Sequence, residues 1–166
     1  MNLQLKTNWG LVEYCKAQLG RPYWYGTFGQ KASEVLYNNR RRAYPKMYTA
    51  TDFPKQYGQK VHDCIGLIKG YMWTDDADST HYTYEAYGFK DLSANMYLSK
   101  CQHKSNDMAS IPEVPGIAVF MKGHVGVYIG NGEVIEARGH DYGVVKTQLK
   151  KRKWTSWAYI DEIQYL

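Results

Sequence analysis

The segment from Cys64 to Trp73 constrains the fold most, because it offers no polar face to solvent. It therefore predicts a helix buried in the core. Its large apolar residues are Ile65, Leu67, Ile68, Tyr71 and Met72. Asp63 is a good N-cap residue, so Cys64 falls in the first helical turn. There the positive end of the helix macrodipole favours the thiolate, the nucleophilic form of cysteine. Taken alone, Cys64 also fits a small buried residue, as free cysteines often are.

The order of the other patterns predicts the fold class. Helical patterns fill the first part of the chain, and short strand patterns follow from Ile117 onward. We predict helices at residues 8–19, 32–42, 64–73 and 92–101, and strands at residues 117–121, 124–129, 133–138, 144–149 and 159–163. In the first helix, one apolar stripe holds Leu11, Val12, Cys15 and Leu19. This order indicates an α+β protein with N-terminal helices packed on a C-terminal antiparallel sheet.

The length and charge bound the organisation and the partners. The chain has 166 residues, enough for a substantial core, and we predict a single domain over residues 1–166. Residues 28–60 are polar but keep many large aromatics, so we interpret them as an insertion folded over the domain. The net charge is +5, which suits an anionic partner such as a cell-wall polymer, nucleic acid or membrane headgroups. The basic runs at residues 40–42 and 150–153 fit a solvated surface.

The cysteine count and the N-terminal residues indicate the cellular compartment in which the protein is made. Cys15, Cys64 and Cys101 are an odd number, so at least one thiol is free and a disulfide framework is not expected. The segment Met1–Lys6 has no basic region followed by an apolar one, and no apolar run approaches membrane-spanning length. We therefore expect no signal peptide, synthesis in the cytoplasm and no insertion into a membrane, or else a trimmed chain.

The glycine-rich turn at residues 130–132 joins two strand patterns into a hairpin. A two-residue loop would put His124 and Glu136 on opposite faces. A three-residue loop, a type I turn ending in a left-handed glycine, would put Gly126 opposite Glu136 and make His124 its diagonal neighbour. Such diagonal Cβ atoms lie about 7–8 Å apart, within reach of an imidazole and a carboxylate. We predict the three-residue loop, because it also gathers the apolar residues on one buried face. These are Val125, Val127, Ile129, Ile135 and Ala137.

Cys64, His124 and Glu136 together supply the parts of a thiol nucleophile. A cysteine nucleophile needs a base that takes its proton and later protonates the leaving amine, and the base needs a third group that fixes its tautomer. His124 fits the base and Glu136 fits the third group. His140, four residues after Glu136, is the reserve candidate for the third position.

Metal sites find little support in the spacing of the candidate ligands. A zinc site from His62, Cys64 and His124 would lack the usual Cys-x-x-Cys and His-x-x-x-His spacings. The acidic loop at residues 75–80 lacks the glycine and the terminal glutamate of a calcium-binding loop. We therefore expect no metal and no cofactor.

Three blocks of the sequence resemble the signature blocks of the NlpC/P60 cysteine peptidases. They are LGRPYWYG at residues 19–26, HDCIGL at residues 62–67 and GHVGVYIGNGEVIEA at residues 123–137. The chain departs from the family pattern at Ile65, where serine is usual, and in the longer segment between Gly26 and Asp63. The resemblance implies a papain-like core with its nucleophile at a helix start, and hydrolysis of amide bonds in peptidoglycan stem peptides.

The resemblance also implies roles for single residues. Cys64 matches the nucleophile and His124 the base, while Glu136 stands where the family most often has histidine and can accept the imidazole N–H. Tyr23 matches a tyrosine whose hydroxyl faces the cysteine and helps to hold the oxyanion. Asp63 matches the acid before the cysteine, which caps the helix or binds the substrate amine.

The leading functional hypothesis is a peptidoglycan hydrolase that cleaves stem-peptide amides by a Cys-His-Glu mechanism. We expect an endopeptidase of the endolysin type, a monomer that reaches the wall at lysis or by another export route. An N-acetylmuramoyl-L-alanine amidase on the same scaffold is the alternative. A lipid acyltransferase more often places histidine before cysteine, and a non-catalytic wall-binding module would use only the aromatic residues and the basic charge. The expected partner is a stem peptide and not nucleic acid.

Overall fold

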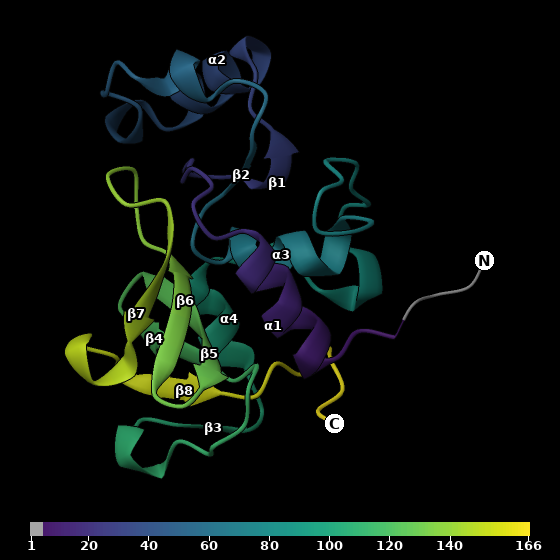
Figure 1. Ribbon diagram of the computed structural model, residues 1–166, viewed down its shortest axis with the longest axis vertical. Coiled ribbons are helices and arrows are strands. Elements are labelled where there is room, and N and C mark those ends of the chain that lie inside the picture. Colours follow the sequence, from purple (N-terminus) through teal and green to yellow (C-terminus); the bar gives the residue numbers. More distant parts are fainter. Residues whose placement is uncertain (1–4) are drawn as a thin grey trace.

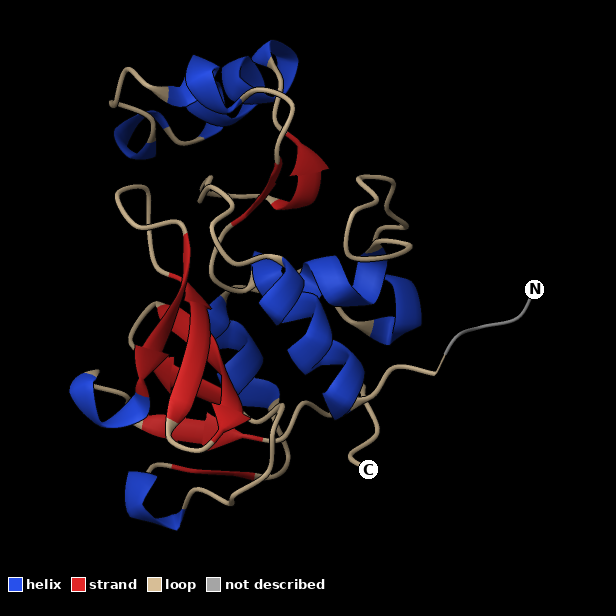
Figure 2. Ribbon diagram, viewed as in Figure 1, coloured by secondary structure: helices blue, strands red, loops and turns tan. Residues whose placement is uncertain are grey.

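Helices cover one face of an antiparallel sheet in the computed structural model (Figure 1; Figure 2). The structure describes residues 5–166, so residues 1–4, which begin the segment predicted to carry no signal peptide, lie outside the described residues. The covering helices are α1 (Asn8–Ala17), α3 (Gly66–Trp73) and α4 (Ala94–Lys100). None of the helices within residues 5–166 is long and apolar enough to cross a bilayer.

The sheet has six strands in the order β3-β8-β4-β5-β6-β7, and each neighbouring pair is antiparallel. The strands are β3 (Lys104–Ser105), β4 (Ala118–Met121), β5 (His124–Gly130), β6 (Glu133–Ala137), β7 (Val144–Gln148) and β8 (Ser156–Ala158). The predicted α+β class, with helices on a C-terminal antiparallel sheet, is confirmed. Short 3-10 helices lie in the connections, at Pro45–Met47, Phe53–Gln56, Ala86–Gly88, Met108–Ser110 and Leu149–Lys151.

Two predictions near the ends of elements are wrong. The last strand is not residues 159–163 but β8, and Ile160 and Ile163 both pack into the main core at a spacing of three, which a turn produces and a strand does not. Helix α1 ends at Ala17, so Leu19 falls outside its apolar stripe and is exposed.

The two faces of the sheet carry separate apolar clusters. The face toward the helices holds Val125, Val127, Ile135 and Ala137, with Ile129 packed beside them, as predicted. The other face carries a smaller cluster that contains Ile117, Val119, Tyr128, Val134, Trp154 and Trp157. Alternation along β5 sends Tyr128 to this second cluster.

The β5–β6 hairpin has the predicted register but not the predicted loop. The loop is two residues, with positive φ at Asn131 (53°) and Gly132 (73°), as a type I′ turn requires. Because Gly130 pairs with Glu133 and Tyr128 with Val134, the register shifts by one residue at a bulge. The bulge restores the register that a three-residue loop would have given, so the pairs Tyr128–Val134 and Val127–Ile135 are the expected ones.

The insertion at residues 28–60 has its own small core. Strands β1 (Phe28–Lys31) and β2 (Lys60–His62) pair antiparallel at its base, and α2 (Glu34–Ala43) lies above them, away from the sheet (Figure 1). The ring of Trp24 is fully buried among Tyr48, Phe53 and neighbouring residues. The predicted helix at 32–42 is confirmed within two residues, and the aromatics of this segment are explained by the core that they form.

Gly66 allows the first turn of α3 to touch the chain at Thr27. A Cβ on Gly66 would lie 1.9 Å from the carbonyl oxygen of Thr27 and 2.7 Å from Asp63 Oδ1. The Thr27 carbonyl accepts the N–H of Asp63, and Asp63 Oδ1 accepts the N–H of Gly66, so moving either atom would break a hydrogen bond.

We therefore expect Gly66→Ala to lower the free energy of unfolding by about 3 kcal/mol, measured by urea denaturation. Gly58→Ala is the control, because Gly58 has a φ of +94° but open space around it. The control should cost only about 1–2 kcal/mol, the usual cost of a left-handed non-glycine residue. Equal losses in the two variants would contradict close packing at Gly66.

Candidate functional site

A cleft of about 550 Å³ opens beside the first turn of α3, and Cys64 lines it. Tyr23 and Asp63, two further predicted site residues, also line this cleft. The remaining walls come from the aromatic segment around Tyr25, the end of α2, and the segment that leads into α4. Gly123 also lines the cleft, which therefore reaches the residue directly before His124.

Asp63 builds the turn that presents Cys64. Its Oδ1 accepts the N–H of Gly66 at 2.6 Å and its carbonyl accepts the N–H of Leu67 at 3.2 Å, which is the pattern of an N-cap. Its Oδ2 accepts the N–H of Gly26 at 3.0 Å. Burial raises the pKa of the Asp63 carboxyl, against the Lys69 charge and these backbone N–H groups. Both oxygens are used in holding the backbone, so the capping role predicted for Asp63 has a structural basis.

The Cys64 thiol is partly buried and protonated in the free protein. Burial, followed by the nearby Asp63 charge, raises the pKa of Cys64 to about 12, although the backbone N–H groups of Val125 and Ile65 favour the thiolate. The sequence-based expectation that the helix start would favour the thiolate is therefore outweighed by desolvation. The remaining cysteines, Cys15 and Cys101, are free and buried.

His124 and Glu136 meet as the register predicts. His124 Nε2 lies 2.8 Å from Glu136 Oε1, and the Glu136 side chain is fully buried. The carboxylate can only accept, so Nε2 carries the hydrogen of this bond and Nδ1 is left as the basic nitrogen. Burial would raise the pKa of Glu136, but hydrogen bonds from His124, Arg152 and Thr147 lower it to about 2. Glu136 is therefore ionised and able to stabilise an imidazolium.

Arg152 and Thr147 were not predicted as site residues. Arg152 donates to both carboxylate oxygens of Glu136, from Nη2 at 2.7 Å and from Nε at 3.0 Å, and Thr147 Oγ1 donates at 2.6 Å. The basic run at 150–153 is thus not only solvated surface. Nothing in that run distinguishes Arg152, whereas Thr147 would follow from the register of β7, where Val145 pairs with Glu136.

The ring of His124 is held from its flat side by Trp154. The two rings stack with their centroids 5.5 Å apart and an interplanar angle of 14°. Gly126 makes this possible, because a Cβ there would lie 3.0 Å from the Trp154 ring and 2.8 Å from Val134. The second apolar cluster therefore positions the imidazole as well as filling the outer face of the sheet.

The structure leaves Cys64 and His124 without a direct hydrogen bond, as judged over residues 5–166. Cys64 packs against the main core, while the His124 ring rests on Trp154 of the second cluster. The chain links them at the start of β5, where the backbone N–H of Val125, the residue after His124, interacts with the Cys64 sulfur. Catalytic hydrogen bonds are often long in free enzymes and shorten when substrate binds.

Tyr23 lines the same cleft as Cys64. It forms a parallel bridge with His62, and the N–H of Trp24 bonds the His62 carbonyl at 3.1 Å, which fixes the aromatic segment next to Asp63 and Cys64. Burial raises the pKa of Tyr23, and the Asp63 and Cys64 charges add to this shift. Its hydroxyl is therefore neutral and able to donate a hydrogen bond.

His140 and the postulated metal ligands have other partners. His140 Nε2 bonds Asp52 Oδ1 at 2.6 Å and its ring packs on Phe53, so this reserve candidate contacts the insertion and not His124. His62 Nε2 bonds the hydroxyl of Tyr14 at 2.7 Å. Within the described part of the chain, no group of three or more His, Cys, Asp or Glu side chains is placed to hold a metal ion.

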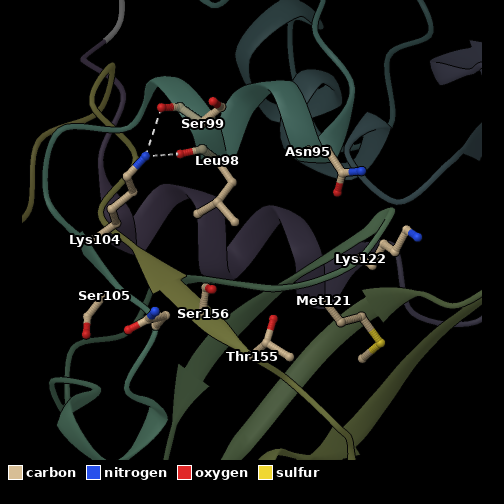
Figure 3. Close-up of a pocket in the computed structure, with 10 residues that line it drawn as sticks. Asn95, Leu98, Ser99, Lys104, Ser105, Met121, Lys122, Thr155 and Ser156 are labelled. Carbon is tan, nitrogen blue, oxygen red and sulfur yellow. Dashed lines mark hydrogen bonds between the residues drawn. The ribbon is translucent and has the colours of Figure 1, made fainter.

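A second hollow, of about 830 Å³, lies between α4 and the β4–β5 turn (Figure 3). Lys104 at one end donates to the carbonyls of Leu98 and Ser99, each at 2.8 Å. Asn95 lines both hollows, and its Oδ1 accepts the N–H of Gly123 at 2.8 Å. This bond ties the turn before His124 to α4, so Asn95 is a further residue that positions the site.

The fold defines an α+β protein with a cysteine at a helix start beside an antiparallel sheet. A model of the NlpC/P60 family matches residues 20–161, and the chain belongs to this family. The predicted family is thereby confirmed. A search of curated proteins gave no match.

Solved structures with this fold share little sequence with the chain. The P60 domain of antigen MAP1204 from M. avium subspecies paratuberculosis has a TM-score of 0.54 and 19% identity, covering 95% of this chain and 96% of that one. The peptidoglycan hydrolase RipB from Mycobacterium tuberculosis has a TM-score of 0.51 and 21% identity, covering 95% of this chain and 67% of the RipB chain. NlpC2 from Trichomonas vaginalis has a TM-score of 0.54 and 16% identity, covering 96% of this chain but only 48% of its own. This chain thus spans about half the length of NlpC2.

The raised pKa of Cys64 predicts how the free protein reacts with iodoacetamide. Since the pKa is about 12, the thiolate fraction and the alkylation rate should rise about tenfold per pH unit between pH 7 and 9. Mass spectrometry of the native protein should find the label on Cys64 alone, because Cys15 and Cys101 are buried. Cys64→Ala is the control and should remain unlabelled. A rate that levels off below pH 8 would instead indicate a thiolate already paired with an imidazolium.

Proposed function

We propose that this protein is a cysteine hydrolase that cleaves amide bonds in peptidoglycan stem peptides, as an endopeptidase. The observation that carries the proposal is the buried, ionised Glu136 at 2.8 Å from His124, beside a cleft that Cys64 lines. Membership of the NlpC/P60 family and the fold shared with RipB, a peptidoglycan hydrolase, support the substrate class. We propose one catalytic domain that includes the insertion and acts as a monomer.

The first half of the reaction forms a thioester. When substrate fills the cleft, His124 Nδ1 takes the proton from the Cys64 thiol, and the sulfur attacks the amide carbonyl carbon. The carbonyl oxygen becomes an oxyanion, held by the Cys64 N–H and the Tyr23 hydroxyl. As the carbon–nitrogen bond breaks, the imidazolium gives its proton to the leaving amine. Glu136 stabilises the imidazolium between these two transfers.

The second half regenerates the thiol. His124 takes a proton from a water molecule, whose oxygen attacks the thioester carbonyl. The carbon–sulfur bond breaks, the thiolate receives the proton from the imidazolium, and the new carboxyl product leaves. No group outside the chain, the substrate and water is needed to balance either half.

The place of action follows from the proposed substrate. The protein is made in the cytoplasm and acts on the cell wall after release or export, without insertion into a membrane and without binding nucleic acid. The net charge of +5 favours contact with anionic wall polymers.

Loss of the nucleophile should abolish lysis. We expect Cys64→Ala to lower the release of fragments from purified cell walls by at least about 10³-fold, because no thioester can form. Cys101→Ala, which removes a buried thiol outside the cleft, is the control and should retain activity. Mass analysis should find a newly free amine on the diamino acid. A newly free L-alanine amine would indicate the amidase, and lysis that survives in Cys64→Ala would indicate a binding module.

Replacing Glu136 should affect kcat more than KM. Glu136→Gln keeps the shape but removes the charge that stabilises the imidazolium, so we expect kcat to fall by roughly 10²–10⁴-fold. Glu133→Gln, on the same strand and paired with exposed Lys146, is the matched control and should be nearly silent. A kcat unchanged in folded Glu136→Gln, checked by circular dichroism, would remove Glu136 from the mechanism.

A further inference from the structure

Arg40 is a cation in the catalytic cleft that has no acidic partner within the described residues. Its Nη1 donates to the neighbouring Asn39 Oδ1 at 2.7 Å, and its Nε is buried without any hydrogen-bond partner. The other charged groups of the cleft are engaged, since Lys69 pairs with Asp91 at 2.6 Å and Asp63 accepts two backbone N–H groups. Arg40 is therefore the charge of the cleft that the protein leaves unpaired.

The insertion holds Arg40 in this place. The side chains of Arg40 and Tyr44, one turn apart on α2 and its end, both pack on Gly26, where a Cβ would lie 3.3 Å from Arg40 Cδ and 2.8 Å from the Tyr44 ring. The Tyr44 ring meets that of Tyr25 edge to face, with 4.9 Å between centroids. Because the N–H of Gly26 bonds Asp63, the same short segment joins Arg40 to the turn that presents Cys64.

The guanidinium offers one nitrogen to a ligand. Nη2 and the adjacent Nε form one edge of the guanidinium, and neither makes a hydrogen bond within residues 5–166. Nε is shielded from solvent, so Nη2 is the nitrogen of this edge that a ligand can reach. A carboxylate that accepts from Nη2 forms a charge-assisted hydrogen bond and lies beside the unpaired guanidinium charge.

The acids of the cleft do not compete for this edge. Both Asp63 oxygens are occupied by backbone N–H groups. Asp91 accepts Lys69 with one oxygen and the Tyr84 hydroxyl with the other. These two carboxylates therefore leave the guanidinium of Arg40 open to an acceptor from a ligand.

We propose that Arg40 binds a carboxylate of the substrate, on the side of the scissile amide that faces the insertion. Arg40 thus determines specificity: it selects peptides in which that carboxyl is free over those in which it is amidated. The inference rests on the proposed function, because it concerns a peptide bound in the same cleft. It assigns to the long insertion the role of supplying a cation for substrate selection.

Binding to an inactive protein tests this selection apart from catalysis. The full chain carrying Cys64→Ala is titrated by calorimetry with pairs of synthetic stem tripeptides. The two peptides of a pair differ at one carboxyl, which is free in one and a carboxamide in the other. One pair is made for each carboxyl of the tripeptide. We expect one free acid to bind roughly 10–100-fold more tightly than its amide, the range for a charged hydrogen-bonded pair. Adding Arg40→Ala should remove this preference by weakening the acid form alone.

Arg42→Ala in the same background is the matched control, because it removes the same charge from an exposed position of α2 outside the cleft. It should keep the preference, and Arg40→Lys should keep part of it. A preference that persists in Arg40→Ala, an equal loss for acid and amide, or no binding of any tripeptide would overturn the inference. If a peptide binds with this preference but the protein with Cys64 intact does not hydrolyse it, that result would instead count against the proposed function.

Discussion

The carboxylate of Asp63 joins the three segments on which the cleft depends. One oxygen caps the turn that carries Cys64, and the other holds the N–H of Gly26 in the aromatic segment. Gly26 in turn lies under Arg40 and Tyr44 of the insertion. A buried carboxylate that satisfies two backbone donors is costly to remove, since both donors would then lack partners. The position of Cys64 and the position of the insertion therefore both depend on the Asp63 side chain.

A second carboxylate organises the sheet side of the site. Glu136 is fully buried, yet it is ionised because His124, Thr147 and Arg152 all donate to it. These donors come from β5, β7 and the segment after β7, so the carboxylate ties together strands that also form the core. The bulge before Asn131 fixes the register of the hairpin, and the register brings Glu136 to the ring. A shift of one residue would move Glu136 into the apolar core.

The sequence predicts those parts of the structure that depend on local periodicity. The helices, the β5–β6 register and the His124–Glu136 pair follow from apolar spacing and from the demand for a single buried face. The loop type does not, because a three-residue loop and a two-residue loop with a bulge give the same register and the same buried face. The final strand does not, because β8 is defined by its pairing with β3 and β4, which lie far away in the chain. Arg152 could not be distinguished within a basic run. The position of Arg40 in the cleft is likewise invisible in sequence, because only the folded insertion places this residue there.

The lack of a direct hydrogen bond between Cys64 and His124, within residues 5–166, fits a mechanism in which the proposed hydrolysis is confined to bound substrate. The buried thiol keeps its proton, and its direct neighbours are backbone N–H groups rather than the imidazole. In the mechanism that we propose, a substrate that fills the cleft displaces water from around the sulfur and brings its carbonyl between the Cys64 N–H and Tyr23, where negative charge is stabilised. In that mechanism, proton transfer to His124 becomes favourable only as the new bond forms. If Arg40 also holds a substrate carboxylate, binding and activation of the nucleophile are coupled through Gly26 and Asp63.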